Sequence, residues 1–469
     1  MKRRRKNVIY EEGGLKKRPW SSDVEIGIVV PMPYRAGMSG LTVYLLQDLL
    51  NSKEGVWSER FFADTPRSVE WNRPLDDFDV VFVTLQYERD VERANRILGR
   101  VKDDAIVIVG GPVAWINPLA VRRADFAYIG EIEVQISGIL SALNKKGRES
   151  RIEALKSVPG MFYRGKKKKT RLQKVKSMRE AWHPYIQVKP DPRHVSLSAY
   201  FIEGSRGCSE YCRFCLIGWS SFPRRDRSAE EIASLVRGAF KSKRDIVSLI
   251  GAGLGFNPWL EEIVRVIREM GLSVIPPSVN PRIVSEELIS LLASGGQRTI
   301  TLSLESSSRI RRIIGKKIDD DDIIRAISII KERMKRIRIY TILGLPGEDE
   351  EDVRELGHFL AKLKKLAPKL YMEATVSVFV PKPNTPFQWA ALIPKNTFLK
   401  RLSILRRIAG IPLLPMKWEE ALFQLSVDRN MPPKKAQYSL SFEDKIPADL
   451  IDTGISKKAL WHAYSKLVE

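Results

Sequence analysis

Residues 204–215 read Gly204-Ser205-Arg206-Gly207-Cys208-Ser209-Glu210-Tyr211-Cys212-Arg213-Phe214-Cys215, and the rest of the chain is organised around this stretch. All three cysteines of the 469-residue chain lie in it, at the spacing C-x3-C-x2-C. Three thiols cannot all pair as disulfides, and a structural zinc site normally takes four ligands. They suit a cubane iron–sulfur cluster in which one iron keeps no protein ligand and is open to a substrate or cosubstrate. The alternative is three buried cysteines that are neighbours by chance.

The composition indicates an ordinary globular protein. A length of 469 residues and a hydrophobic content of 43% predict two or three domains. No run of eighteen apolar residues occurs, so we expect no transmembrane segment, and the basic start is not followed by the apolar stretch of a secretory signal. Clustered thiols without a disulfide framework favour a reducing, cytoplasmic location.

The net charge is strongly positive. Lys and Arg number 79 against 56 Asp and Glu, a formal charge of +23. Such a charge favours RNA or another polyanion as a partner. A basic, solvated surface typical of a Lys- and Arg-rich, thermophilic proteome is an equal alternative.

The first half of the chain predicts a doubly wound α/β domain. A basic tail, residues 1–22, precedes a domain over 23–145. Apolar runs that read as strands alternate there with helical stretches such as 41–50; the runs are 24–30, 78–84, 105–109 and 126–130. This alternation indicates a parallel, Rossmann- or flavodoxin-like sheet whose ligands bind beyond the carboxyl ends of the strands.

The second half predicts a partial barrel. A basic linker, residues 146–197 with a Lys/Arg block at 164–171, leads into a core over 198–405 and a small helical C-terminal cap over 406–469. Six strand–helix units fill the core, with strands at 197–201, 246–250, 273–276, 299–304, 338–343 and 373–379. Six parallel strands with helices outside form a partial (β/α)6, TIM-type barrel, whose site lies at the carboxyl ends of the strands.

The cysteine loop, together with Phe214 before the last cysteine, resembles that of radical S-adenosylmethionine (SAM) enzymes. The resemblance implies that Cys208, Cys212 and Cys215 hold a 4Fe–4S cluster whose fourth iron binds SAM. It also implies a reductant such as ferredoxin or flavodoxin. Reductive cleavage of SAM then gives a 5′-deoxyadenosyl radical that attacks an unactivated C–H bond.

Later strand ends match the same family. Gly251 and Gly253 lie where the family has a Gly-Gly-Glu-like stretch for the methionine amine, although the usual acid is missing and a plain turn is the alternative. The resemblance implies that Ser278 lies near the ribose and that Glu305, a candidate catalytic residue, meets SAM. A salt bridge to an arginine is the alternative for Glu305. Gly344, Pro346 and Gly347 match the turn near adenine. Phe387 and Trp389, on a stiff loop, either line a pocket or pack the cap.

The first half resembles the cobalamin-binding-like domain that precedes many radical SAM cores. The resemblance rests on five stretches, which are 38–41, 58–62, 78–88, 110–118 and 130–133. Many such domains carry a histidine below cobalt, but residues 23–145 contain none. Cobalamin therefore either binds without a histidine lower ligand or is absent from a domain that shares only the fold.

These features imply a radical SAM enzyme that functionalises a C–H bond, with cobalamin-dependent methylation as one outcome. The substrate is open: RNA, lipid or small metabolite. A methylthiotransferase is disfavoured, because a second cluster would need three further cysteines. A non-catalytic iron–sulfur protein is the remaining alternative.

Overall fold

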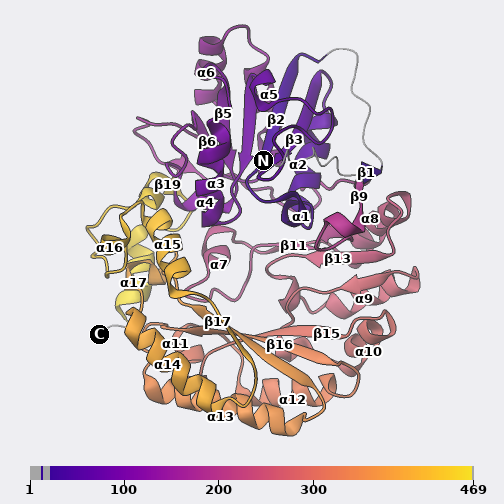
Figure 1. Cartoon of the computed structure of the whole chain (residues 1–469), viewed down its shortest axis with the longest axis vertical. Helices are drawn as coiled ribbons and strands as arrows, with labels where there is room; N and C mark the ends of the chain where they lie inside the picture. Colours follow the sequence, from indigo (N-terminus) through magenta and orange to yellow (C-terminus); the bar gives the residue numbers. More distant parts are fainter. Residues whose placement is uncertain (1–11, 14–21, 467–469) are drawn as a thin grey trace, which may run out of the picture. The chain divides into compact units, whose positions relative to one another are not determined.

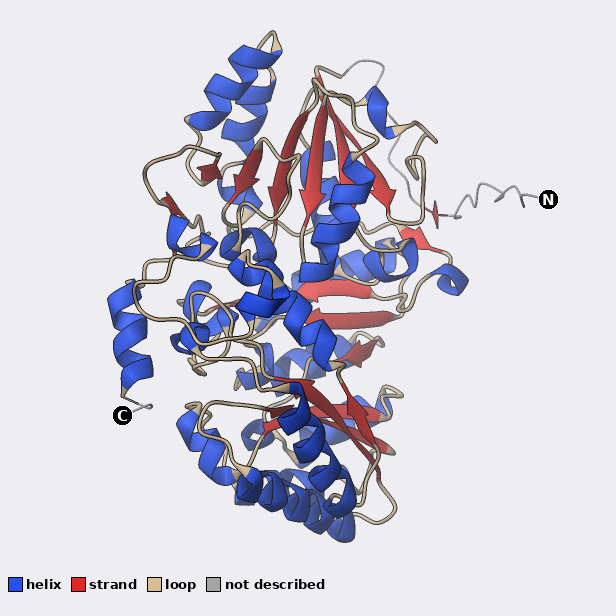
Figure 2. Ribbon diagram, turned by 60° about the vertical axis from the view of Figure 1, so that its left-hand side comes forward, coloured by secondary structure: helices blue, strands red, loops and turns tan. Residues whose placement is uncertain are grey.

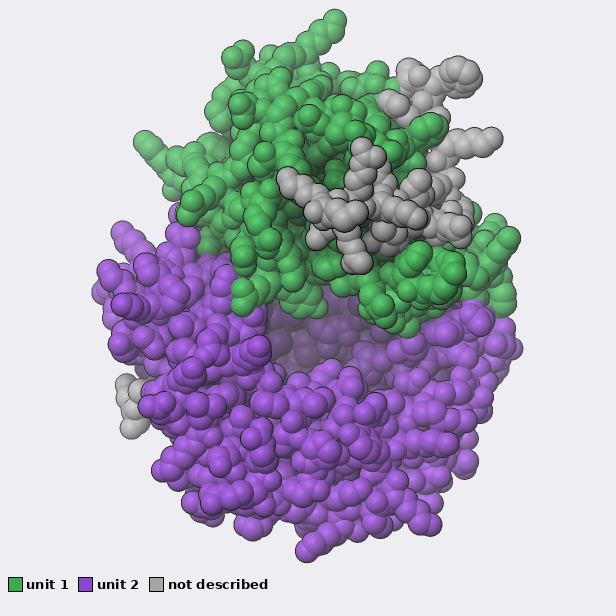
Figure 3. Space-filling view, in the orientation of Figure 1, with its two compact units in different colours: residues 1–201, 237–244 green, residues 202–236, 245–469 purple. Residues whose placement is uncertain are grey.

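The structure is a computed structural model that describes residues 12–13 and 22–466. Most of the predicted basic tail, residues 1–22, lies outside the described residues. The chain divides into two compact units: unit 1 holds Met1–Phe201 and Arg237–Arg244, and unit 2 holds Ile202–Val236 and Asp245–Glu469. Figure 3 colours the two units separately.

Unit 1 is built on one six-stranded sheet of order β3-β2-β4-β5-β6-β7. Its strands are β2 Val24–Val30, β3 Val56–Phe62, β4 Val80–Thr84, β5 Ile106–Gly110, β6 Phe126–Tyr128 and β7 Met161–Phe162. All neighbours pair in parallel except β7, which runs antiparallel to β6. Helices that include α2 (Leu41–Asn51) and α3 (Glu88–Leu98) lie on both sides of the strands (Figure 2), so the doubly wound prediction is confirmed.

Strand β3 is absent from the predicted strands because its centre is polar. All seven of its residues are nevertheless buried, including Glu59 and Arg60. Arg60 forms an ion pair of 2.5 Å with Glu70, and Glu59 accepts a 2.5 Å hydrogen bond from Ser68. Charges can be buried in a strand when a neighbouring segment supplies opposite charge and hydrogen bonds, and local sequence patterns do not reveal this.

The predicted linker, residues 146–197, is partly built into unit 1. Helix α6 (Arg148–Lys156) precedes β7, whose Met161 and Phe162 pair with Tyr128 and Ala127 of β6. The sheet therefore extends beyond residue 145, and unit 1 continues to Phe201. A two-residue strand gives too short a pattern for sequence-based prediction.

Unit 2 contains the predicted partial barrel. Its strands run in the orders β10-β13-β14 and β15-β16-β17-β18, and the parallel bridge Val279–Leu302 joins the two sets. The bounds are β10 Tyr200–Glu203, β13 Ile246–Ile250, β14 Ser273–Ile275, β15 Thr299–Glu305, β16 Arg336–Leu343, β17 Tyr371–Val378 and β18 Leu413–Pro415. The first six correspond to the predicted strands, and the short β18 is an addition. The boundary between the units falls inside β10.

Helices cover the outside of this sheet. In Figure 1, α11 (Ser308–Ile313), α12 (Asp320–Ile330), α13 (Glu350–Leu366) and α14 (Lys395–Ile408) lie on one side of β15–β16–β17. A capping box precedes α8 (Ala229–Lys241): Ser228 N donates to the Glu231 carboxylate at 2.8 Å, and Glu231 N donates to Ser228 Oγ at 3.1 Å. None of the helices in the described part of the chain is long and apolar enough to cross a membrane.

The aromatic residues of the stiff loop pack the C-terminal cap. Phe387 and Trp389 are 0% and 2% exposed. Their rings contact Tyr464 of α17 (Lys457–Ser465), with centroids 6.4 and 5.9 Å apart, and Trp389 also contacts Trp461. Of the two alternatives for these residues, packing is the one observed.

The buried ion pair of β3 gives a stability prediction. Glu70→Gln removes the carboxylate facing Arg60, whose side chain is 0% exposed, and breaking a buried pair on one side costs about 3–5 kcal/mol. Urea unfolding of the full chain measures this loss. The exposed Glu54→Gln is the control and should change the unfolding free energy little; equal effects of the two substitutions would contradict a buried pair.

Candidate active site

Backbone contacts hold the cysteine loop at the mouth of the barrel. Arg213 N donates to Ile314 O at 2.9 Å, and Phe387 N donates to Arg213 O at 3.2 Å. The Arg213 guanidinium also donates to Ile313 O. Two of these three bonds join the loop to the end of α11, so this helix end helps to fix the position of the cysteine loop.

The three thiols are close enough to influence one another and lie largely away from solvent. Cys208 and Cys212 are each 9% exposed, and Cys215 is half-buried. Burial raises the pKa of all three thiols, that of Cys212 to about 12, and charge on each of the other cysteines raises the Cys212 pKa further. The thiols are therefore neutral without metal, and a metal must displace their protons on binding.

The donor set fits a cluster better than a single ion. Among the residues that the structure describes, no three His, Cys, Asp or Glu side chains are arranged to hold one metal ion. In a cubane each thiolate binds a different iron, so the three sulfur atoms need not converge on one point. Three soft ligands on one loop fit such a cluster, and they leave one iron without a protein ligand.

The glycine-rich turn after β13 packs directly on the cysteine loop. A Cβ atom at Gly251 would lie 2.4 Å from Ser205 Oγ, and one at Gly253 would lie 2.6 Å from Gly207 O. Gly207 immediately precedes Cys208. These positions therefore need glycine for close backbone approach. The turn therefore supports the backbone that presents the first cysteine.

Ser278 follows β14 and adjoins the same turn. A Cβ atom at Gly255 would lie 1.8 Å from Ser278 O, and Asn280 N donates to Gly255 O at 2.9 Å. The Ser278 side chain is half-buried. The structure thus brings the turns after β13 and β14 together by their backbones.

Glu305 forms a buried ion pair, but with a lysine. Its side chain meets Lys316 Nζ at 2.5 Å, and the two residues are 8% and 5% exposed. The predicted alternative partner was an arginine; Arg311 instead pairs with Asp320. Glu305 also has φ 69°, a left-handed conformation that is strained for a residue other than glycine, and the register of β15 shifts just before it.

Lys316 lies beside the cysteine loop. A Cβ atom at Gly315 would lie 3.9 Å from Tyr211 O, and Ile314 O accepts the Arg213 N–H. The ammonium of Lys316 acts to lower the pKa of Cys212, whereas Glu305 acts to raise it. Sequence reasoning did not single out Lys316. Only the fold brings residues 212 and 316 together.

The turn Gly344–Gly347 after β16 is fixed by Glu348. Gly344 N donates to the Glu348 carboxylate at 3.0 and 3.2 Å, and Arg401 of α14 donates to the same carboxylate at 2.8 Å. Burial raises the pKa of Glu348 to about 7, although the Gly344 amide and Arg401 act to lower it. Arg401 is 53 positions away, so no local pattern predicts this contact.

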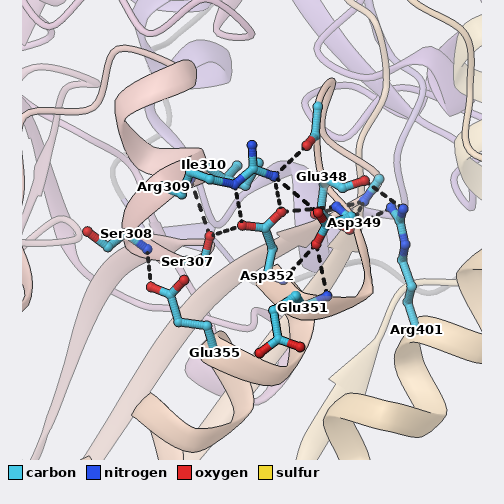
Figure 4. Close-up of polar contacts among 12 residues, drawn as sticks. Ser307, Ser308, Arg309, Ile310, Glu348, Asp349, Glu351, Asp352, Glu355 and Arg401 are labelled. Carbon is cyan, nitrogen blue, oxygen red and sulfur yellow. Dashed lines mark hydrogen bonds and ion pairs between the residues drawn. The ribbon is translucent and has the colours of Figure 1, made fainter.

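A second set of contacts joins this turn to the one after β15 (Figure 4). Arg309 of α11 donates to Gly347 O at 2.7 Å and to Asp352 of α13 at 3.0 Å. Ser307 Oγ donates to the same Asp352 oxygen at 2.8 Å. Pro346 lies within the turn, and its neighbour Leu345 belongs to the apolar cluster against which Phe214 of the cysteine loop packs. The predicted site residues thus fall in one connected region of unit 2.

The fold and this region define an iron–sulfur enzyme of the partial-barrel type, and sequence comparison agrees. Residues 202–360 match the radical SAM superfamily, and residues 42–163 match the N-terminal domain of radical SAM proteins. The chain is therefore a radical SAM enzyme with that N-terminal domain. Its cofactors are a 4Fe–4S cluster and SAM, and it needs a reductant.

One related sequence and two solved structures are similar to most of this chain. The uncharacterized protein MJ0966 of Methanocaldococcus jannaschii is 29% identical over 371 residues, 77% of this chain and 79% of that protein. The solved radical SAM methyltransferase TsrM from Kitasatospora setae, with cobalamin and a [4Fe-4S] cluster, has TM-score 0.57 and 15% identity, covering 78% of this chain and 77% of TsrM. The cobalamin-dependent radical enzyme OxsB has TM-score 0.56 and 15% identity, covering 84% and 58%. At these identities the two structures show a shared fold.

The raised pKa of Glu348 predicts a pH effect on stability. Its folded-state pKa of about 7 exceeds the ordinary 4.5, so the folded chain binds this proton more tightly than the unfolded chain. Stability from this group is full below the ordinary pKa and is lost as pH rises towards 7. Each unit of pKa difference is worth about 1.4 kcal/mol.

Glu348→Gln removes the titration. Compared with this variant, the wild-type chain should lose unfolding free energy between pH 4.5 and 7, as measured by urea unfolding at several pH values. Glu351→Gln, at a side chain that is 83% exposed in the first turn of α13, should keep the wild-type slope. Parallel wild-type and Glu348→Gln curves would refute the assignment.

Proposed function

We propose that Cys208, Cys212 and Cys215 ligate the 4Fe–4S cluster and that the enzyme functionalises an unactivated C–H bond of its substrate. One observation carries this proposal. The only three cysteines of the chain share one loop, and that loop packs against the turn with Gly251 and Gly253 and is hydrogen-bonded to the end of α11. When bound, the cluster supplies the electron that cleaves SAM into methionine and a 5′-deoxyadenosyl radical. A non-catalytic iron–sulfur protein would not require these turns to surround the loop.

The chain's own residues position the cosubstrate in this proposal. The turn with Gly251 and Gly253 offers backbone groups to the methionine end of SAM, and Ser278 offers a hydroxyl to the ribose. Glu305 accepts hydrogen bonds from SAM while Lys316 balances its charge. Gly344, Pro346 and Gly347 contact adenine through a backbone that Glu348 fixes. Placing these groups in advance lowers the entropic cost of reaching the reactive geometry.

The charge of the chain and the chemistry of its thiols suggest a reductant, a cellular location and a partner. A ferredoxin or flavodoxin is the proposed reductant, and a reducing cytoplasm is the proposed location, since three free thiols persist there. The charge of +23 supports a polyanionic partner such as RNA as a candidate, with gel shifts against total tRNA at several salt concentrations as the test.

We also propose that unit 1 binds cobalamin and that the reaction is a methylation. The shared fold with TsrM and OxsB supports this, and ligands of doubly wound sheets bind beyond the carboxyl ends of the strands. Residues 23–145 contain no histidine. The turn after β2 is filled by the chain's own Tyr34 and Met38, both 0% exposed. The residues present therefore fit cobalamin only without an imidazole from that domain.

Removing one cysteine tests the cluster assignment. After anaerobic reconstitution with iron and sulfide, wild-type protein should show 4Fe–4S absorbance and form 5′-deoxyadenosine from SAM under reduction. Cys212→Ala should lose both, because two thiolates do not hold the cubane. Ser209→Ala in the same loop is the control. A Cys212→Ala variant that keeps its iron and sulfide would overturn the ligand set.

Cobalamin binding has a separate test. Protein produced anaerobically with hydroxocobalamin supplied should retain a corrinoid absorbance through gel filtration, at about one corrinoid per chain. Loss of all corrinoid, with SAM cleavage intact, would refute the cobalamin proposal and leave the radical chemistry standing.

A further inference from the structure

One face of the sheet β15–β16–β17 is polar where a barrel interior is normally apolar. Side chains alternate along strands, and in β16 the residues Ile337, Ile339 and Leu343 are buried. The alternate positions of the three strands share the opposite face, away from α11–α14 in Figure 1. Most of them are polar, and they include Thr301, Ser303, Arg338, Tyr340, Glu373 and Thr375.

This face is not a packed core. The interior of a complete (β/α) barrel is filled by layers of bulky, branched apolar side chains. Here Tyr340 is 39% exposed at the middle of β16, and the register places it between Ser303 and Thr375. A row of three hydroxyl-bearing residues in the middle of a sheet has hydrogen bonds to offer to a ligand.

A group of three charges lies further from the strand carboxyl ends, with Arg338 and Glu373 one row beyond Tyr340 and Arg336 two rows beyond it. The Glu373 carboxylate, with a side chain 4% exposed, meets Arg338 at 2.8 Å and Arg336 at 3.2 Å. The two arginine side chains are 38% and 43% exposed. One carboxylate facing two guanidinium groups leaves a surplus of one positive charge. Arginine has five N–H donors, which suit a carboxylate or phosphate.

We propose that this face is the substrate surface and that it binds a small hydrophilic molecule carrying a carboxylate or phosphate, which Arg336 and Arg338 receive. The inference rests on the proposed function, since the substrate must react at the carboxyl ends of these strands. Arg338 and Ile342 are four residues apart, about 13 Å along the strand. The substrate is therefore an elongated molecule, with its anionic end deep in the barrel and its reacting carbon at the mouth.

The polarity of this face does not suit a lipid substrate. An alkyl chain laid over Thr, Ser, Tyr and Arg side chains would remove water from them without replacing their hydrogen bonds. Such desolvation costs free energy for each polar group that is left unsatisfied. A polar, anionic molecule restores these bonds and balances the surplus charge.

Two substitutions of opposite effect test the proposal. Binding of pyrophosphate and of citrate to the reconstituted full chain is measured by equilibrium dialysis at fixed ionic strength. Arg338→Gln should weaken binding about tenfold or more, because it removes a charge-assisted bond. Glu373→Gln should tighten binding severalfold, since it raises the surplus charge. The control Arg354→Gln removes an equal charge from α13, where the side chain is 42% exposed, and should leave binding unchanged.

Thermal unfolding of each variant shows whether it is folded. A purely structural ion-pair group predicts that Arg338→Gln and Glu373→Gln both lower stability without these opposite changes in affinity, and that result overturns the proposal. Equal weakening by Arg338→Gln and Arg354→Gln also overturns it, as does binding of total tRNA that depends on Arg338 while neither small anion binds. If wild-type protein shows the predicted anion pattern but forms no 5′-deoxyadenosine, the proposed function fails and the anion site stands. If the protein forms 5′-deoxyadenosine but does not show the predicted anion pattern, only the anion site is rejected.

Discussion

Close approach of backbone to backbone at the barrel mouth is the constraint on which the rest of the site depends. The turns after β10, β13 and β14 meet with no room for side chains at Gly251, Gly253 and Gly255, where an added Cβ atom would lie 2.4, 2.6 and 1.8 Å from its nearest neighbour. A larger residue at Gly251 or Gly253 would push against the cysteine loop, and one at Gly255 would push against the turn after β14. The glycines therefore govern where the thiols lie, although they carry no chemistry of their own.

Buried charge is the second feature that organises the mouth. The pairs Glu305–Lys316 and Glu348–Arg401 place one carboxylate at the end of β15 and one after the turn that follows β16, and each is balanced by a cation from a later segment. Burying such pairs brings little stability, because desolvation offsets most of the Coulomb attraction. Their value here is positional: Glu348 fixes the backbone of a turn, and Glu305 sits in a left-handed conformation that the surrounding structure must maintain. Strain and costly charge at the same place are typical of a functional site.

Much of this could be predicted from the sequence. Apolar runs between turn residues located five strands of the barrel to within two residues, and the cysteine spacing located the loop. Besides the short strand β18, three features of the structure were not predicted. The charged residues Glu59 and Arg60 interrupt the apolar pattern of strand β3, and their ion-pair partners are Arg73 and Glu70. Strand β7 is two residues long. The cations that complete the site, Lys316 and Arg401, are 11 and 53 positions from their carboxylates, and only the fold reveals such pairs.

The central claim is that three thiolates from one loop hold a cluster whose fourth iron is open to SAM. The direct measurement is the electron paramagnetic resonance spectrum of the reduced, reconstituted protein with and without SAM. If SAM binds the open iron, its amine and carboxylate change the electronic environment of the cluster, so the g values must shift on addition of SAM. A reduced 4Fe–4S signal that stays unchanged at saturating SAM would contradict the account.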